Sequence, residues 1–102
     1  MELQNSIKQT VLSVLPNAKV LLFGSRAKGN YTALSDYDFL VVTENDLPLN
    51  EKRDFAGKIR RALIALLNAP VDVLINSREE ISKKKLLPGH VIKQALNEGI
   101  EL

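Results

Sequence analysis

Hydrophobic residues in this chain follow two patterns, and the switches between them predict alternating helices and strands. Leu3, Ile7 and Val11 recur every four residues, which indicates an amphipathic helix that covers a sheet and is ended by Pro16 and Asn17. Short apolar runs bounded by turn residues indicate strands. The elements predicted after the first helix are a strand over Lys19–Phe23, a helical turn after Gly24-Ser25, a strand from Asp36 to Thr43, a loop over Glu44–Asn50, a helix over Glu51–Asn68, a strand over Val71–Ile75, a helix from Ser77 to about Lys85, a helix from Val91 to a C-cap at Gly99, and a short strand over Ile100–Leu102.

This order predicts an α/β (α+β) sandwich in which helices flank a small mixed sheet. At 102 residues the chain is long enough for one hydrophobic core, so we expect a single domain over residues 1–102. Ser77 and Glu80 have the spacing of a capping box, which supports a helix start at that point.

Composition narrows the class of protein without identifying it. Hydrophobic residues make up 45% and charged residues 25%, the balance of an ordinary globular domain. A net charge of +2 is too small to indicate direct nucleic-acid binding. The absence of cysteine excludes disulfides and thiolate chemistry and fits a cytoplasmic location. The longest apolar run, Ala62–Leu67, is too short for a membrane span, and we expect a soluble protein.

Three aspartates are the main candidates for chemistry. Alternate strand residues point to the same face, so Asp36 and Asp38 are expected to share one face of their strand. Such a pair suits a hard cation such as Mg2+, although an Asp-x-Asp sequence can also cap a turn or be solvated. Asp72 is expected in the middle of a half-buried strand, where an uncompensated carboxylate is costly. A third acid beside the first two would complete a site for two metal ions, as used in displacement at phosphorus.

The turn after the first strand is the second candidate. Gly24-Ser25 follows a strand and precedes a helical segment, where backbone N–H groups can receive a phosphate, although such a turn can be purely structural. Arg26 and Lys28 follow it. These cations could be solvated charges, or they could stabilise the negative charge on a departing pyrophosphate.

Together these residues resemble a known signature. Gly24-Ser25, the step to Asp36, Asp38 two residues later and the strand acid Asp72 are similar to the motif of the DNA polymerase β-like nucleotidyltransferase superfamily. The sequence FGSRAKGNYTALSDYDFLVV is most similar to its minimal nucleotidyltransferases, and the resemblance covers nearly the whole chain.

The resemblance implies specific roles for these residues. Asp36 and Asp38 would ligate two Mg2+ ions, and Asp72 would ligate one of them and help to deprotonate an acceptor hydroxyl. Gly24 and Ser25 would hold the triphosphate of a nucleoside triphosphate, with ATP as the expected substrate.

The resemblance also implies a partner. Larger members append a helical domain, and we expect the second wall of the cleft to come from another protein in a homo- or hetero-oligomer. Minimal nucleotidyltransferases are often encoded beside a helical HEPN toxin and act as its antitoxin, and for some the resemblance implies AMP transfer from ATP to a tyrosine of the toxin. The alternatives are a non-catalytic binding module that neutralises its partner by complex formation, and a transferase for a small molecule such as an aminoglycoside.

Overall fold

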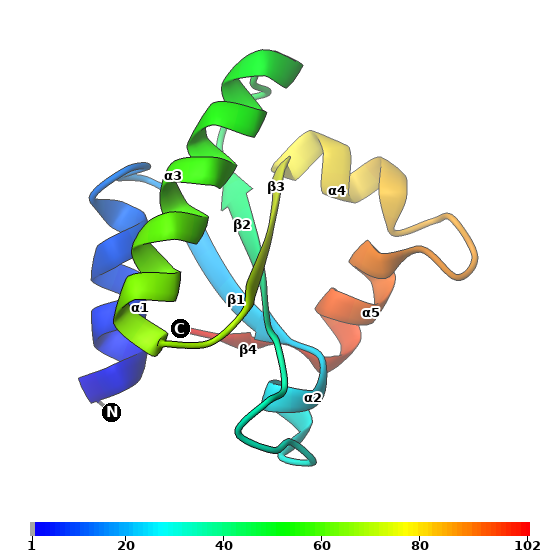
Figure 1. Ribbon diagram of the computed structural model, residues 1–102. Coiled ribbons are helices and arrows are strands. Elements are labelled where there is room, and N and C mark those ends of the chain that lie inside the picture. Colours follow the sequence, from blue (N-terminus) through cyan, green and yellow to red (C-terminus); the bar gives the residue numbers. More distant parts are fainter. Residues whose placement is uncertain (1) are drawn as a thin grey trace.

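The structure, a computed structural model, describes residues 2–102 and consists of a four-stranded sheet between two groups of helices (Figure 1). The elements in chain order are α1 (Glu2–Leu12), β1 (Lys19–Phe23), α2 (Ser25–Lys28), β2 (Tyr37–Thr43), α3 (Leu49–Leu67), β3 (Val71–Ser77), α4 (Arg78–Lys84), α5 (Val91–Glu98) and β4 (Ile100–Glu101). The prediction of an α/β sandwich with helices on a small sheet is confirmed.

The sheet is mixed, with strand order β3-β2-β1-β4. β1 pairs antiparallel with β2 and with β4, whereas β2 and β3 are parallel. A parallel pair needs a crossover connection, and α3 supplies it between β2 and β3. β2 therefore lies in the interior of the sheet, with a neighbour on each side.

The two faces of β2 pack against different helices, which confirms the predicted alternation. Phe39 and Val41 belong to the main core, formed with residues of α1 and α3 such as Ile7 and Ile59. Leu40 lies on the opposite face in a smaller core with Ile92 and Ala95 of α5. In Figure 1, α1 and α3 lie on one side of the sheet, and α4 and α5 lie on the other.

Local signals at the helix ends behave as the sequence indicates. Ser77 caps α4 in a capping box: its hydroxyl accepts from the Glu80 backbone N–H at 3.1 Å, and the Glu80 carboxylate accepts from the Ser77 N–H at 2.9 Å. His90 caps α5, where its Nδ1 accepts from the Ile92 N–H at 3.1 Å. Along residues 2–102, none of the helices combines the length and apolar character that a membrane span requires.

Several predicted boundaries are wrong by a few residues. α1 ends at Leu12, before Pro16, although Val14 and Leu15 still pack on the core. α3 begins at Leu49, so the loop before it is shorter than predicted. β3 continues to Ser77, because its parallel ladder with β2 extends that far, and β4 ends at Glu101.

Candidate active site

Two of the three candidate acids lie side by side on the sheet. In the parallel ladder between β2 and β3, Asp38 pairs with Asp72. Both project from the face on which Leu40 and Leu74 contact α5, since residues two positions apart share a face. The predicted position of Asp72 beside the Asp-x-Asp sequence is therefore confirmed.

Gly24 brings the end of β1 against the same carboxylate. Phe23, the last residue of β1, pairs with Asp38, and Gly24 follows with φ 75° and ψ −159°. That conformation is essentially restricted to glycine. A Cβ at position 24 would collide with Oδ2 of Asp38. Glycine is needed here both for its backbone angles and for the space that the Asp38 carboxylate occupies.

Asp36 lies just outside β2, contrary to the prediction that it belongs to the strand. The ladder begins at Tyr37, whose N–H donates to the Pro70 carbonyl at 3.0 Å, and Asp36 is the residue before it. Its side chain is exposed. Asp36 is nevertheless close enough to act electrostatically on Asp38.

Asp38 is the acid of the site whose pKa is shifted by its surroundings. Burial raises the pKa of the Asp38 carboxyl above its ordinary value, and the charges of Asp72 and Asp36 raise it further. Burial disfavours the ionised form of Asp38 because it removes water from the carboxylate, and the two neighbouring carboxylates disfavour it by like-charge repulsion. A bound cation would reverse this effect, because it would favour the ionised form of each carboxylate.

β3 is half-buried, as predicted, but the Asp72 side chain itself is exposed, so the cost of an uncompensated buried carboxylate does not apply to it. β3 is an edge strand, and on this face only its later residues, such as the buried Asn76, lie under a helix. The apolar neighbours Val71 and Ile75 face the other side of the sheet, in the main core. Asp72 is consequently open to an incoming molecule.

A cavity of about 410 Å3 lies over the two paired acids. It is lined by Phe23, Asp38, Asp72, Val73, Leu74, Val91 and Gln94. Val91 and Gln94 come from the first turn of α5, and neither was predicted as a site residue. Their only sequence signal is their place at the start of a helix that covers the strand of Asp38.

The donor set fits Mg2+ bound together with a nucleotide. Among residues 2–102, no three acidic or histidine side chains are arranged as a ready-made metal-binding group. Mg2+ is usually held by one or two carboxylates plus substrate phosphates and waters, so a complete protein cage is not required. The carboxylates of Asp36, Asp38 and Asp72 are hard oxygen donors that could act as ligands, and phosphate oxygens would supply others.

The two candidate cations after Gly24-Ser25 point in different directions. Lys28 forms an ion pair with Glu98 of α5 at 2.9 Å, and the hydrogen bond from Lys28 lowers the pKa of Glu98. Both side chains remain partly exposed, and such a pair is easily exchanged for another anion. Lys28 therefore stays a candidate for contact with phosphate.

Arg26 lies on the opposite face of the sheet from Asp38. It lines a small hollow with residues of the main core, including Ile7 and Leu22. Its guanidinium contacts the connector before β2 and the rings of Tyr31 and Tyr37. The structure does not bring Arg26 together with the three acids.

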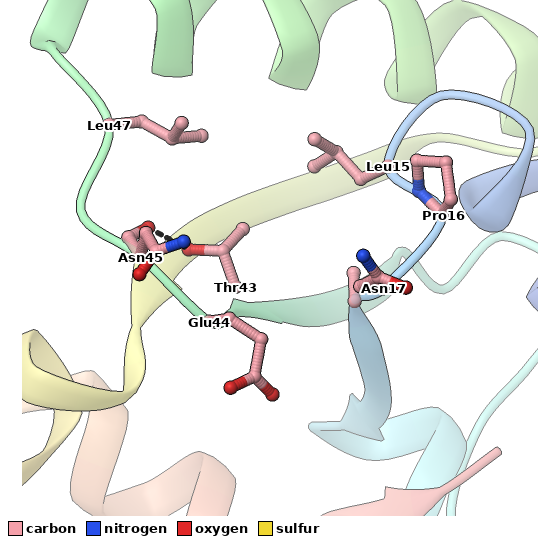
Figure 2. Close-up of a pocket in the computed structure, with 8 residues that line it drawn as sticks. Leu15, Pro16, Asn17, Thr43, Glu44, Asn45 and Leu47 are labelled. Carbon is pink, nitrogen blue, oxygen red and sulfur yellow. Dashed lines mark hydrogen bonds between the residues drawn. The ribbon is translucent and has the colours of Figure 1, made fainter.

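A second pocket, of about 190 Å3, lies at the other end of β2 (Figure 2). It is lined by Leu15, Pro16, Asn17, Ala18, Thr43, Glu44, Asn45 and Leu47. The Thr43 hydroxyl, which would be a donor for a ligand, already donates to the Asn45 carbonyl at 2.9 Å. This pocket holds one acid and no glycine turn, so the acidic cavity remains the candidate active site.

Comparison with known proteins identifies the family. Residues 3–102 match the family model described as "Nucleotidyltransferase domain". The chain therefore belongs to the nucleotidyltransferase domain family, which confirms the resemblance that the motif indicated.

A curated relative points in the same direction. A protein of Methanocaldococcus jannaschii, described as a candidate protein adenylyltransferase, is 32% identical over 66 residues. The match covers 65% of this chain and 60% of that relative, so this chain matches less than two thirds of the relative's length.

Solved structures share the fold. A toxin–antitoxin structure with AMP-PNP has a TM-score of 0.66 at 21% identity, over 96% of this chain and 70% of that one. A tri-AMPylated Shewanella oneidensis HEPN toxin in complex with its MNT antitoxin gives 0.56 at 18% identity, over 97% and 67%. A structure described as a candidate minimal nucleotidyltransferase gives 0.58 at 26% identity, over 97% of this chain and 95% of that one.

Proposed function

We propose that this protein is a Mg2+-dependent nucleotidyltransferase that transfers AMP from ATP to a hydroxyl group of a partner protein. The main observation behind the proposal is that Asp38 and Asp72 are paired across β2 and β3, with the Gly24 turn packed against Asp38. This arrangement supports the proposal, because the two carboxylates could act as oxygen ligands for a metal beside a backbone turn that could receive a triphosphate. The relative described as a candidate protein adenylyltransferase supports a protein as the acceptor.

Each candidate residue has a role in this reaction. Asp36 and Asp38 would hold two Mg2+ ions, and Asp72 would hold one of them. When bound, the ions neutralise charge on the phosphates and on the departing pyrophosphate. Gly24 and Ser25 would orient the triphosphate, with Lys28 near the leaving group.

Asp72 is the proposed base. The acceptor oxygen forms a bond to the α-phosphorus of ATP while the bond from that phosphorus to the bridging oxygen of pyrophosphate breaks. The acceptor hydroxyl gives its proton to the Asp72 carboxylate, and pyrophosphate leaves with the bonding electrons. The exposure of Asp72 supports this role, since an acceptor can reach it from solvent.

We further propose that the acceptor is a tyrosine of a HEPN-type toxin and that the protein acts as an antitoxin. The tri-AMPylated HEPN toxin of Shewanella oneidensis, seen in complex with an MNT antitoxin, supports this assignment. Exposed apolar side chains support a protein surface as partner: Val91, which lines the cavity, is 39% exposed, and Leu86 and Leu87 in the connection between α4 and α5 are 77% and 50% exposed. Because the donor is ATP, we place the reaction in the cytoplasm.

A transfer assay with labelled ATP, Mg2+ and the protein encoded beside this one tests the proposal. Label should pass to that protein with wild type and should not pass with Asp36→Asn or Asp38→Asn at unchanged far-ultraviolet circular dichroism. If neither wild type nor variants transfer label but all inhibit the partner equally, the protein is a binding module and the enzymatic proposal is wrong.

A further inference from the structure

Arg26 holds the connector that leads into Asp36. Its Nε and Nη2 donate to the Ser35 carbonyl at 3.3 and 3.1 Å, and Nη2 also reaches the Ala33 carbonyl at 3.5 Å. Its guanidinium carbon lies 4.6 Å from the ring centre of Tyr31 and 4.2 Å from that of Tyr37. The side chain therefore contacts the connector at several points at once.

The Ser35 carbonyl belongs to the peptide that carries Asp36. On the other side of Asp36, the Tyr37 N–H is held by the Pro70 carbonyl at 3.0 Å. Asp36 has no place in the sheet ladder, yet each flanking peptide is fixed. The first of these two anchors is the Arg26 guanidinium.

The connector itself is a closed turn. The Ser35 N–H donates to the Thr32 carbonyl at 3.1 Å, the Thr32 N–H donates to the Ser35 hydroxyl at 3.0 Å, and the Leu34 N–H donates to the Thr32 hydroxyl at 3.2 Å. These bonds shape the turn but do not tie it to the sheet. Arg26 connects the turn to the sheet, because its guanidinium also lies over the ring of Tyr37 in β2. The Tyr37 ring in turn stacks on the Phe39 ring, with ring centres 6.0 Å apart.

A single guanidinium can make all of these contacts at once, which an ammonium cannot do in this geometry. A planar guanidinium can place two parallel N–H groups on one carbonyl while its face lies on aromatic rings. Within residues 2–102, no carboxylate lies at ion-pair distance from Arg26. Its charge is satisfied by carbonyls and rings on the face of the sheet away from Asp38.

We propose that Arg26 is a positioning residue: it clamps the Thr32–Ser35 turn and thereby sets the place of Asp36 in the metal site, and it does not bind the triphosphate. The clamp also links the nucleotide-binding turn to the acids, since Arg26 directly follows Ser25 in the chain. This inference rests on the proposed function for the role of Asp36, but its physical content can be tested without catalysis.

The only two tyrosines of the chain both lie in the clamp, and the chain has no tryptophan. Near-ultraviolet tyrosine circular dichroism therefore reports on the clamp directly. Arg26→Gln should lose most of that signal while keeping its far-ultraviolet spectrum. Arg53→Gln, at an exposed arginine of α3, is the matched control and should resemble wild type.

Metal binding by the free protein, followed with Mn2+ by electron paramagnetic resonance, is the second measurement. Arg26→Gln should weaken Mn2+ binding by about tenfold, the lower end of the effect of removing a supporting residue behind a metal ligand. Arg53→Gln should leave it unchanged. Unchanged Mn2+ binding in Arg26→Gln, or an unchanged tyrosine signal in that variant, would overturn the proposal.

Comparing the affinities for ATP and for AMP distinguishes a positioning role of Arg26 from direct contact with the β- and γ-phosphates. Arg26→Gln should change the affinities for both nucleotides by the same factor. Loss of ATP affinity with AMP affinity and the tyrosine signal intact would show that Arg26 binds the β- and γ-phosphates, which would refute the clamp.

A conservative variant keeps the proposal testable if Arg26→Gln does not fold. Arg26→Lys keeps the charge but cannot place two parallel N–H groups on the Ser35 carbonyl while a flat face lies on the tyrosine rings, so its Mn2+ affinity should lie between those of wild type and Arg26→Gln. An Arg26→Lys variant identical to wild type in both signals would contradict the need for the guanidinium. If wild type transfers no nucleotide, the proposed function is wrong. The tyrosine and Mn2+ measurements still show whether Arg26 holds the Thr32–Ser35 turn in place.

Discussion

Replacing Gly24 with alanine should damage the active site through one identifiable collision. Gly24 has φ 75° and ψ −159°, and a side chain in this region costs about 1–3 kcal/mol. The new Cβ would also meet Oδ2 of Asp38. Overpacking of this kind costs typically about 1–3 kcal/mol. Gly24→Ala should therefore lower the free energy of unfolding by about 2–6 kcal/mol and displace the Asp38 carboxylate.

Gly29→Ala is the matched control. Gly29 also has a positive φ, 83°, at the end of α2, but a Cβ there would meet nothing within 4 Å. Gly29→Ala should lower the free energy of unfolding only by the cost of the left-handed backbone conformation, about 1–2 kcal/mol. Urea denaturation of both variants gives the two free energies. Transfer activity should be lost in Gly24→Ala and kept in Gly29→Ala.

A double-mutant cycle isolates the collision. Asp38→Ala removes the carboxylate that the new methyl group would strike, so the cost of Gly24→Ala should fall by about 1–3 kcal/mol in the Asp38→Ala background. Additive effects, within about 0.5 kcal/mol, would refute the inferred contact between the turn and the carboxylate.

Three further changes test the other residues of the site. The pKa of Asp38 is raised in the native state from its ordinary value of 3.8, so above that pH the native state binds more protons than the unfolded state. The free energy of unfolding should therefore fall as pH rises through this window. Urea denaturation of Asp38→Asn at several pH values should not show this decline. Ser25→Ala should weaken ATP binding by about 1–3 kcal/mol, measured by calorimetry, and an unchanged affinity would remove Ser25 from the site. Asp72→Asn should lower the transfer rate far more than nucleotide affinity, and wild-type turnover by this variant would exclude Asp72 as the base.

Sequence periodicity predicts the sheet and its faces well because both depend on local alternation. The division of Phe39 and Leu40 between two cores follows from the period of a strand alone. The motif predicts that Asp38 and Asp72 lie close together. Their direct pairing could not be predicted, because it depends on the register between two strands that are distant in sequence.

The errors concern features that depend on tertiary contacts. Asp72 was expected in a half-buried strand where its carboxylate would need compensation, yet on its face of β3 only the later residues are covered by helices, so its side chain is exposed. Nothing in the sequence indicates that Arg26 turns away from the acids, since its partners are backbone carbonyls and aromatic rings that any loop could offer. Asp36 falls outside the strand because the ladder starts only where Tyr37 meets Pro70.

Mass spectrometry of the partner protein encoded beside this one, after incubation with ATP and Mg2+, tests the central claim most directly. Wild type should add AMP to a tyrosine of that partner and relieve its toxicity, whereas Asp38→Asn should add nothing and leave the partner toxic. A partner that stays unmodified but is inhibited equally by wild type and Asp38→Asn would contradict nucleotidyl transfer as the function of this site.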